Sequence, residues 1–180
     1  MIVYLLAGIV VLVALLFIII ALRPAEFTYV RSAKIAAPPE KVFPHVNDLH
    51  QWQAWSPWAK LDPNSKSTFT GPGTGVGAAM AWAGNNKVGE GKMTIIESRP
   101  GELIRIRLEF LKPMQATHTA EFTFKAEGSL TVLKWAMSGR NNFMGKAFGL
   151  FVNCDKMIGG QFEQGLASLN AVTKEAEKTR

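Results

Sequence analysis

The sequence predicts an α+β domain with a curved antiparallel sheet of six to seven strands, two short helices and a long C-terminal helix, preceded by one transmembrane helix. Three observations predict this class. Residues 2–22 are an uninterrupted apolar run, residues 67–138 alternate with period two between glycine and proline breaks, and helical periodicity returns after residue 139. Strands in succession with helices at either end are typical of an α+β layer architecture.

The composition limits the alternatives. The chain has 180 residues, of which 48% are apolar, and carries 20 Lys and Arg against 14 Asp and Glu, for a formal net charge of +6. This length suits one ordinary domain, and the apolar content excludes a mainly disordered chain. Cys154 is the single cysteine, so an intramolecular disulfide and a site of several thiolates are both impossible.

The apolar run at residues 2–22 has no charged side chain. As a helix it would be about 30 Å long, the thickness of a bilayer's hydrocarbon core. The alternative is a cleavable signal peptide, but a basic n-region is missing, the run exceeds the usual h-region, and Ile19 and Leu22 do not suit a cleavage site. We therefore expect a transmembrane anchor over residues 1–23 and a domain over residues 24–180.

Basic residues flank this run on one side. Arg23, Arg31 and Lys34 follow it, whereas only the terminal amine precedes it. The positive-inside rule then predicts a single-pass membrane protein whose domain faces the cytoplasm. All 20 basic side chains lie after residue 22, scattered without a run of three, so nucleic-acid binding is not expected. Their excess favours an anionic leaflet by about 1 kcal/mol for each basic residue near its surface.

Residues 27–36 alternate and suit a strand that two prolines end. A short helix is expected next, over residues 38–48, with a break near Pro44. Asp48 can cap a second short helix over residues 49–55, which Ser56 and Pro57 stop.

The alternating region predicts six strands, at residues 68–70, 76–83, 88–98, 103–111, 117–126 and 130–138. The fourth is the clearest. Its apolar positions on one face are Ile104, Ile106, Leu108 and Phe110, and its charged positions on the other are Arg105, Arg107 and Glu109. One face of the sheet is therefore expected to be buried and the other solvated.

After Gly139 the pattern predicts one long amphipathic helix with an apolar stripe at Phe151, Ile158, Phe162, Gly165, Leu166, Leu169 and Val172. Each glycine inside a helix costs about 1 kcal/mol relative to alanine, so Gly159, Gly160 and Gly165 indicate a bend or a close approach to another surface. A strongly twisted sheet that curls around this helix would leave an elongated apolar cavity between them.

Four segments together resemble the SRPBCC superfamily, in its polyketide cyclase/dehydrase-like branch: WQAWSPWAKLDP, GPGTGVGAAMAWAGNNKVGEGKMTIIES, LEFLKPM and GQFEQGLASL. The resemblance implies the helix-grip fold shared with START lipid-transfer domains, whose terminal helix lies across a curved sheet around a hydrophobic cavity for lipids, sterols or polyketides. The family motif positions are Trp52, Trp55, Ser56, Pro57 and Trp58. The resemblance supplies no catalytic residue.

Strand parity and the helix stripe predict the residues that line such a cavity. The candidates for ligand binding are Trp58, Met80, Trp82, Met93, Ile106, Leu108, Phe110, His118, Phe122, Trp135, Met137, Phe151, Ile158 and Phe162. Most are also needed for the core of a domain of this size. Thioether and indole groups suit adaptable apolar pockets.

Other chemical signals are weak. Gly73-x-Gly75-x-x-Ala78 matches a dinucleotide fingerprint in form, but the following residues alternate like a strand, so we expect a hairpin and no cofactor. His45, Asp48 and His50 are a poor metal-binding pattern, and no metal is expected. No histidine lies in a recognisable catalytic motif.

We therefore expect a membrane-anchored domain that binds or transfers a hydrophobic, lipid-like small molecule, with the bilayer and that molecule as its partners. One alternative is an accessory subunit with a membrane-protein partner. The other is a cyclase or hydrolase acting on an apolar substrate, which needs an inward ionisable group such as His118 or Glu90.

Overall fold

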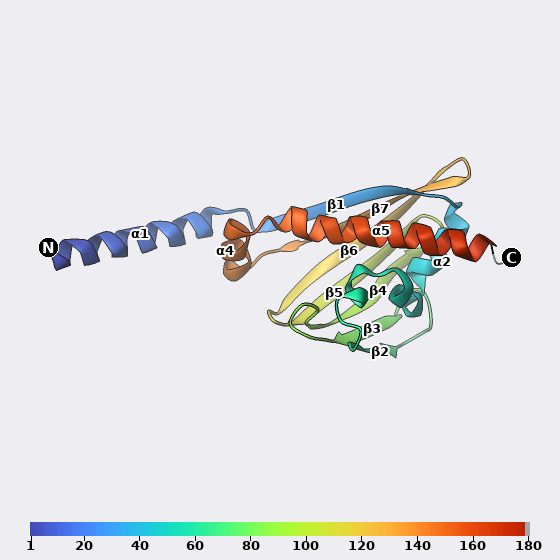
Figure 1. The fold of residues 1–180 in the computed structure, drawn as a ribbon, viewed down its shortest axis with the longest axis horizontal. Helices are drawn as coiled ribbons and strands as arrows, with labels where there is room; N and C mark the ends of the chain where they lie inside the picture. Colours follow the sequence, from blue (N-terminus) through green and yellow to red (C-terminus); the bar gives the residue numbers. More distant parts are fainter. Residues whose placement is uncertain (179–180) are drawn as a thin grey trace.

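The computed structural model describes residues 1–178, which form one antiparallel sheet with helices on its concave side and one projecting helix (Figure 1). The helices are α1 (Ile2–Leu22), α2 (Pro39–Asn47), α3 (Trp52–Trp55), α4 (Phe143–Phe151) and α5 (Cys154–Lys178), with 3-10 turns η1 (Leu49–Gln51) and η2 (Pro57–Lys60). The strands are β1 (Glu26–Ile35), β2 (Lys66–Thr70), β3 (Ala79–Ala83), β4 (Glu90–Arg99), β5 (Leu103–Lys112), β6 (Ala116–Glu127) and β7 (Leu130–Arg140). The α+β class is confirmed.

The sheet places β1 beside β7, so that its order is β1-β7-β6-β5-β4-β3-β2. The strands from β2 to β7 follow one another as hairpins, and β1 closes the far edge. Two register shifts in β4, at Glu90/Gly91 and Ile95/Glu97, bend the strand. The helix α5 lies along the concave face, next to β1 (Figure 1).

The alternation in β5 separates a buried apolar face from a charged outer face, as expected. Ile104 and Ile106 have no exposed surface, whereas Arg105 lies on the outer face. There the Arg105 guanidinium pairs with Glu97 on β4 and with Glu121 on β6, 2.8 Å away. The apolar face is therefore turned toward the helices, and a ladder of charges covers the convex face.

Four large aromatic side chains form the centre of the core. Trp52 and Trp55 lie with ring centroids 4.7 Å apart and meet Phe122 and Trp135 edge-on. The two indole nitrogens donate to the carbonyls of Val46 and His45, each at 2.9 Å. These contacts hold α2 and α3 on the concave face and explain why the tryptophan-rich segment folds there.

The helix α2 continues through Pro44, so the expected break there is wrong. A proline at this position removes the bond to the carbonyl of Glu40 and crowds that carbonyl with its ring. Both residues are exposed, and water can serve that carbonyl. The packing of Val42, Phe43 and Val46 in the core fixes the helix across the proline.

The C-terminal region is two helices, which corrects the expectation of one helix after Gly139. Val152 is extended, with φ −120° and ψ 130°, and ends α4. Asn153 then accepts a hydrogen bond from the backbone N–H of Lys156 at 2.9 Å and so caps α5. Phe151 consequently lies off the buried stripe and is 79% exposed.

The glycines of α5 have different surroundings. A Cβ on Gly165 would lie 2.8 Å from Cζ3 of Trp135 and 3.1 Å from Cδ of Pro57, so this glycine permits the close approach of α5 to β7 and η2. A Cβ on Gly159 would overlap the guanidinium of Arg31. Gly160, in contrast, has open space where a Cβ would be.

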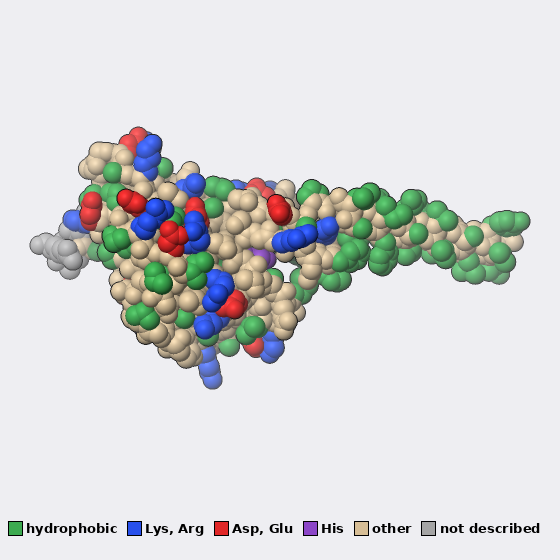
Figure 2. Space-filling model, turned by 180° about the vertical axis from the view of Figure 1, so that it is seen from behind, with side chains coloured by type: hydrophobic (Ala, Val, Ile, Leu, Met, Phe, Trp, Pro, Cys, Tyr) green, Lys and Arg blue, Asp and Glu red, His purple; other side chains and the backbone are tan. Residues whose placement is uncertain are grey.

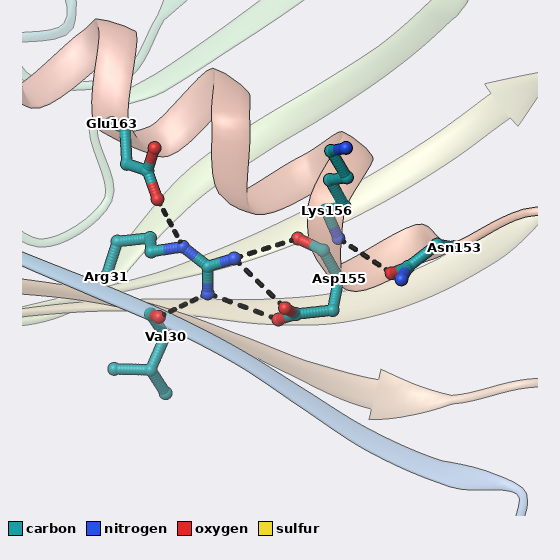
Figure 3. A network of polar contacts seen from close by, with 6 residues as sticks. All are labelled: Val30, Arg31, Asn153, Asp155, Lys156 and Glu163. Carbon is teal, nitrogen blue, oxygen red and sulfur yellow. Dashed lines mark hydrogen bonds and ion pairs between the residues drawn. The ribbon is translucent and has the colours of Figure 1, made fainter.

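Arg31 fastens the beginning of α5 to β1 (Figure 3). Its Nη2 lies 3.0 Å from Oδ2 of Asp155, and its Nε lies 2.7 Å from Oε1 of Glu163. Asp155, Gly159 and Glu163 are four residues apart and share one face of the helix, so the guanidinium fits over the glycine. The hydrogen bond from Arg31 holds the pKa of Asp155 below its ordinary value.

The helix α1 projects away from the sheet, and hydrophobic side chains cover its visible face (Figure 2). Among residues 1–178 it is the one helix long and apolar enough to span a membrane. Its last turns pack on α4, with the rings of Phe17 and Phe143 stacked at 5.4 Å. Arg23 donates to the carbonyl of Gly149 and Lys146 donates to that of Ala21, each at 2.9 Å.

Gly165→Ala is expected to lower the free energy of unfolding by about 1–3 kcal/mol, because the new methyl group meets the rigid rings of Trp135 and Pro57. Gly160→Ala is the matched control and should raise it by about 0.5–1 kcal/mol, since alanine favours the helix and the space is free. Urea titration of the full-length protein in detergent micelles, followed by tryptophan fluorescence, measures both. Equal effects of the two substitutions would contradict the close approach at Gly165.

Candidate ligand-binding cavity

A cavity of about 290 Å³ lies between the concave face of the sheet and the helices α3 and α5. Its wall combines side chains from β2 to β7 with residues of α3, η2 and α5. The residues expected from the sequence that line it are Trp58, Met80, Trp82, Met93, Leu108, Phe110, Trp135, Met137, Ile158 and Phe162. The wall is therefore mainly apolar and aromatic.

Four expected residues lie outside this wall. Ile106 and Phe122 have no exposed surface and belong to the packed core. Phe151 lies at the end of α4, beside a different hollow. His118 is on the concave face, between the rings of Phe27 and Phe110 at centroid distances of 4.9 and 5.4 Å.

The structure adds residues that sequence reasoning did not select. They are Trp52, Gln53, Ser56, Ala59, Ser65, Ser67, Asn86, Lys87, Val88, Gly89, Lys112, Pro113 and Ala120. Most come from loops and turns that only the tertiary fold brings together. Ala120 could have been predicted from the sequence, because it lies on the same inward face of β6 as Phe122 and its small side chain leaves space above the sheet.

Exposure separates the mouth of the cavity from its floor. The exposed lining residues are Gln53, Asn86, Lys87, Lys112 and Pro113, whereas Met80, Met93, Ala120, Trp135 and Phe162 are buried. The mouth is thus polar and basic, although Lys112 is paired with Glu90 at 2.7 Å. The floor is apolar, which suits a molecule with one oily and one polar end.

Trp135 provides a polar group deep in this wall. Its ring stacks on Phe162 at a centroid distance of 4.2 Å and is 2% exposed. Its indole Nε1 is buried and has no hydrogen-bond partner among the described residues. A buried donor without a partner is costly, and the packing of this ring must offset that cost.

A second, larger hollow of about 640 Å³ lies beside α4 and is open to solvent. Arg23, Glu26, Lys146 and Asp155 give it a polar lining. Burial, with a further contribution from the neighbouring Cys154, raises the pKa of Tyr29 there to about 12. The phenol of Tyr29 therefore stays protonated. Because this hollow is polar and open to solvent, we take the apolar cavity as the candidate site.

The weaker motifs do not assemble into sites within the described part of the chain. The segment from Gly71 to Ala78 is a loop that leads into β3, and Gly71, Gly75 and Gly77 have positive φ. His50 Nδ1 lies 3.0 Å from Asp48 Oδ1, and the buried Nδ1 of His45 has no partner. In residues 1–178 no three His, Cys, Asp or Glu side chains are placed to hold a metal ion.

A curved antiparallel sheet gripped by its last helix over an apolar cavity defines the START-like, helix-grip class of protein. The sequence model of the family described as "Polyketide cyclase / dehydrase and lipid transport", which is of the SRPBCC type, matches residues 26–174. The chain belongs to this family. The resemblance expected from the tryptophan, glycine and C-terminal helix segments is therefore confirmed.

Solved structures share the fold at low sequence identity. Protein CV1439 from Chromobacterium violaceum is 17% identical, with a TM-score of 0.60 over 81% of this chain and 96% of that one. Ara h 8.0201 is 12% identical, with a TM-score of 0.56 over 81% and 99%. The di-domain ARO/CYC StfQ from the steffimycin biosynthetic pathway is 10% identical, with a TM-score of 0.61 over 86% of this chain and 52% of that one. No curated protein is significantly similar in sequence.

Burial lowers the pKa of His118 below its ordinary value. In the unfolded chain the imidazole of His118 has a pKa of about 6.5 and therefore binds a proton more readily than in the folded protein. The contribution of neutral His118 to the free energy of unfolding is complete above about pH 6.5 and is lost as the pH falls. The free energy of unfolding of the wild type should drop between pH 7.5 and 5.5, and His118→Leu should reduce that drop. Urea titrations of the full-length protein in micelles at both pH values measure it.

Burial also lowers the pKa of His45. The double variant His45→Gln/His118→Leu should therefore have a flatter profile than His118→Leu alone. A drop of the same size in the wild type and in both variants would show that these two half-buried histidines do not cause it.

Proposed function

We propose that this protein binds a hydrophobic, lipid-like small molecule in the cavity and holds it beside a membrane in which α1 is the anchor. The observation that carries the proposal is the open apolar space between the sheet and α5, with a basic mouth. Membership in a family described by lipid transport supports it. The residue boundaries that we propose are 1–23 for the anchor and 24–180 for the domain.

The cavity volume limits the ligand. A water molecule, similar in size to a methylene group, takes about 30 Å³ of liquid, so about 290 Å³ holds roughly ten heavy atoms. A lipid with two long acyl chains exceeds this space. The fitting class is a single medium-length chain or a small ring system, whose burial gains about 25 cal/mol for each Å² of apolar surface.

Polar groups would select one end of that molecule. An acidic headgroup could meet Lys87 at the mouth. The described lining contains serines and lysines but no Asp, Glu, His or Cys side chain. A serine nucleophile there would have no carboxylate or imidazole in the wall to activate it, so the chemistry of the wall favours binding over catalysis.

The anchor would place this cavity at the cytoplasmic face. Arg23, Arg31 and Lys34 follow α1, and the positive-inside rule puts such residues in the cytoplasm. Tethering keeps the cavity and its lipid source within reach of each other, so no search through solution is needed.

Ala120→Phe is expected to fill the floor of the cavity and weaken ligand binding about tenfold or more. Full-length protein in detergent micelles would be titrated with bromodecanoate, whose bromine quenches Trp58, Trp82 and Trp135 in the wall. Native mass spectrometry of the same protein would detect any ligand that purifies with it.

Ala136→Phe is the matched control. Ala136 follows Trp135 in β7 and therefore lies on the outer face of the sheet, whereas Trp135 faces the cavity. It adds the same bulk outside the cavity, so binding should stay at the wild-type level. Absence of both a co-purified ligand and saturable quenching in the wild type would overturn the proposal, as would full binding by Ala120→Phe.

A further inference from the structure

The strand register places three connections at one end of the sheet. Glu26, the first residue of β1, pairs with Arg140 at the end of β7. Each later strand is antiparallel to its neighbour, so the β5–β6 turn and the β3–β4 turn lie at this same end. In Figure 1 these turns are on the side of the domain from which α1 projects.

The mouth of the cavity is at this end. Asn86 and Lys87 belong to the β3–β4 turn, and Lys112 and Pro113 belong to the β5–β6 turn. The mouth and α1 therefore share one end of the sheet, while the loop from Gly71 to Ala78 and the turn at Ser129 lie at the opposite end.

Exposed apolar side chains gather at the end that carries α1. They are Leu111 and Met114 beside the β5–β6 turn, and Met144, Phe148 and Phe151 on α4, with exposures of 55%, 45%, 60%, 46% and 79%. We call these five residues the apolar rim. A group of exposed apolar side chains such as this marks a surface that contacts another apolar phase.

The packing of α4 on α1 indicates which phase that is. Phe143 of α4 stacks on Phe17, five residues before the end of α1 at Leu22. Five residues of helix span about 7.5 Å, which matches the depth of about 5–10 Å at which interfacial helices lie. With α1 across the bilayer, α4 would therefore lie at the boundary between headgroups and acyl chains.

The charges at this end agree with a lipid surface. Arg23 and Lys146 lie where α1 meets α4, and Lys87 is exposed at the mouth. The acidic groups near them are Glu26, Asp155 and Glu90, of which Asp155 is paired with Arg31 and Glu90 with Lys112. Long basic side chains beside an apolar surface can reach anionic headgroups while their stems stay in the apolar layer.

From this geometry we propose that the apolar rim docks on the bilayer, so that the cavity mouth opens at headgroup level and exchanges its ligand with the leaflet directly. The proposal rests on the membrane-anchored binding function above. It commits to the lipid surface as the occupant of the rim, because the rim continues from α1 and its neighbours are basic.

Nitroxide labels measure the docking. Single cysteines would be introduced as Met114→Cys, Phe148→Cys and, at the opposite end, Ser129→Cys, each in a Cys154→Ser full-length protein in vesicles of phosphatidylcholine and phosphatidylglycerol. Labels at 114 and 148 should show an oxygen-to-nickel accessibility ratio about threefold or more above that at 129. A label at 114 that is as accessible to nickel as the label at 129 would overturn the proposal.

A protein partner on the rim has a different signature. It would shield the labels at 114 and 148 from oxygen and nickel alike, and that result also contradicts docking on lipid. In the Met114→Cys protein, Leu111→Asp should raise nickel accessibility at the label, whereas Val76→Asp, which changes an exposed valine at the opposite end, should not. An unchanged label in the Leu111→Asp protein would count against the rim.

Ligand binding is scored separately. Leu111 and Met114 lie outside the cavity wall, so the Leu111→Asp protein should bind bromodecanoate in micelles as the wild type does. Absence of binding in the wild type with immersed labels at 114 and 148 would reject the binding function and leave the docking in place. Binding without immersion would reject the docking alone.

Discussion

The close contact of α5 with one half of the sheet determines the rest of the structure. Phe162 stacks on Trp135, and Gly165 lets the helix backbone approach the same indole. On the β1 side, Arg31 holds the beginning of the helix through Asp155. The helix consequently contacts β1, α3 and η2 extensively, while the strands β3 to β5 curve away from it. The cavity is the space that remains because α5 packs against only one half of the sheet. The same helix contact therefore builds the core and leaves the cavity open.

The large-scale pattern could be predicted from sequence because it depends on period alone. Alternation in β5 determined which face is buried, and the apolar run defined α1. The break between α4 and α5 could not be predicted this way, because it depends on the extended conformation of Val152 and the side chain of Asn153, while the apolar pattern continues across both. Cavity residues in strands followed parity, whereas Ser65 and Asn86 reach the wall only through loop geometry.

The position of the ionisable side chains gives the two faces of the sheet different chemistry. Three acidic groups of β4 to β6 pair with arginines on the convex face: Glu97, Glu109 and Glu121. The half-buried His118 lies between two aromatic rings beside the wall. Solvated charges on one face and apolar bulk on the other are what a half-buried antiparallel sheet requires. A space lined by the buried face therefore begins with affinity for apolar molecules.

The junction between α1 and the sheet has a mechanical consequence. Only residues 23–25 separate α1 from β1. Arg23 donates a hydrogen bond to the carbonyl of Gly149, and Lys146 donates one to the carbonyl of Ala21, so the helix end is tied to α4. This connection is rigid, because rotation of the domain relative to α1 would break both hydrogen bonds and separate the stacked rings of Phe17 and Phe143. With α1 as the proposed membrane anchor, the domain would keep a fixed height and tilt above one leaflet. It would then serve that leaflet alone and could not carry a ligand to a facing membrane.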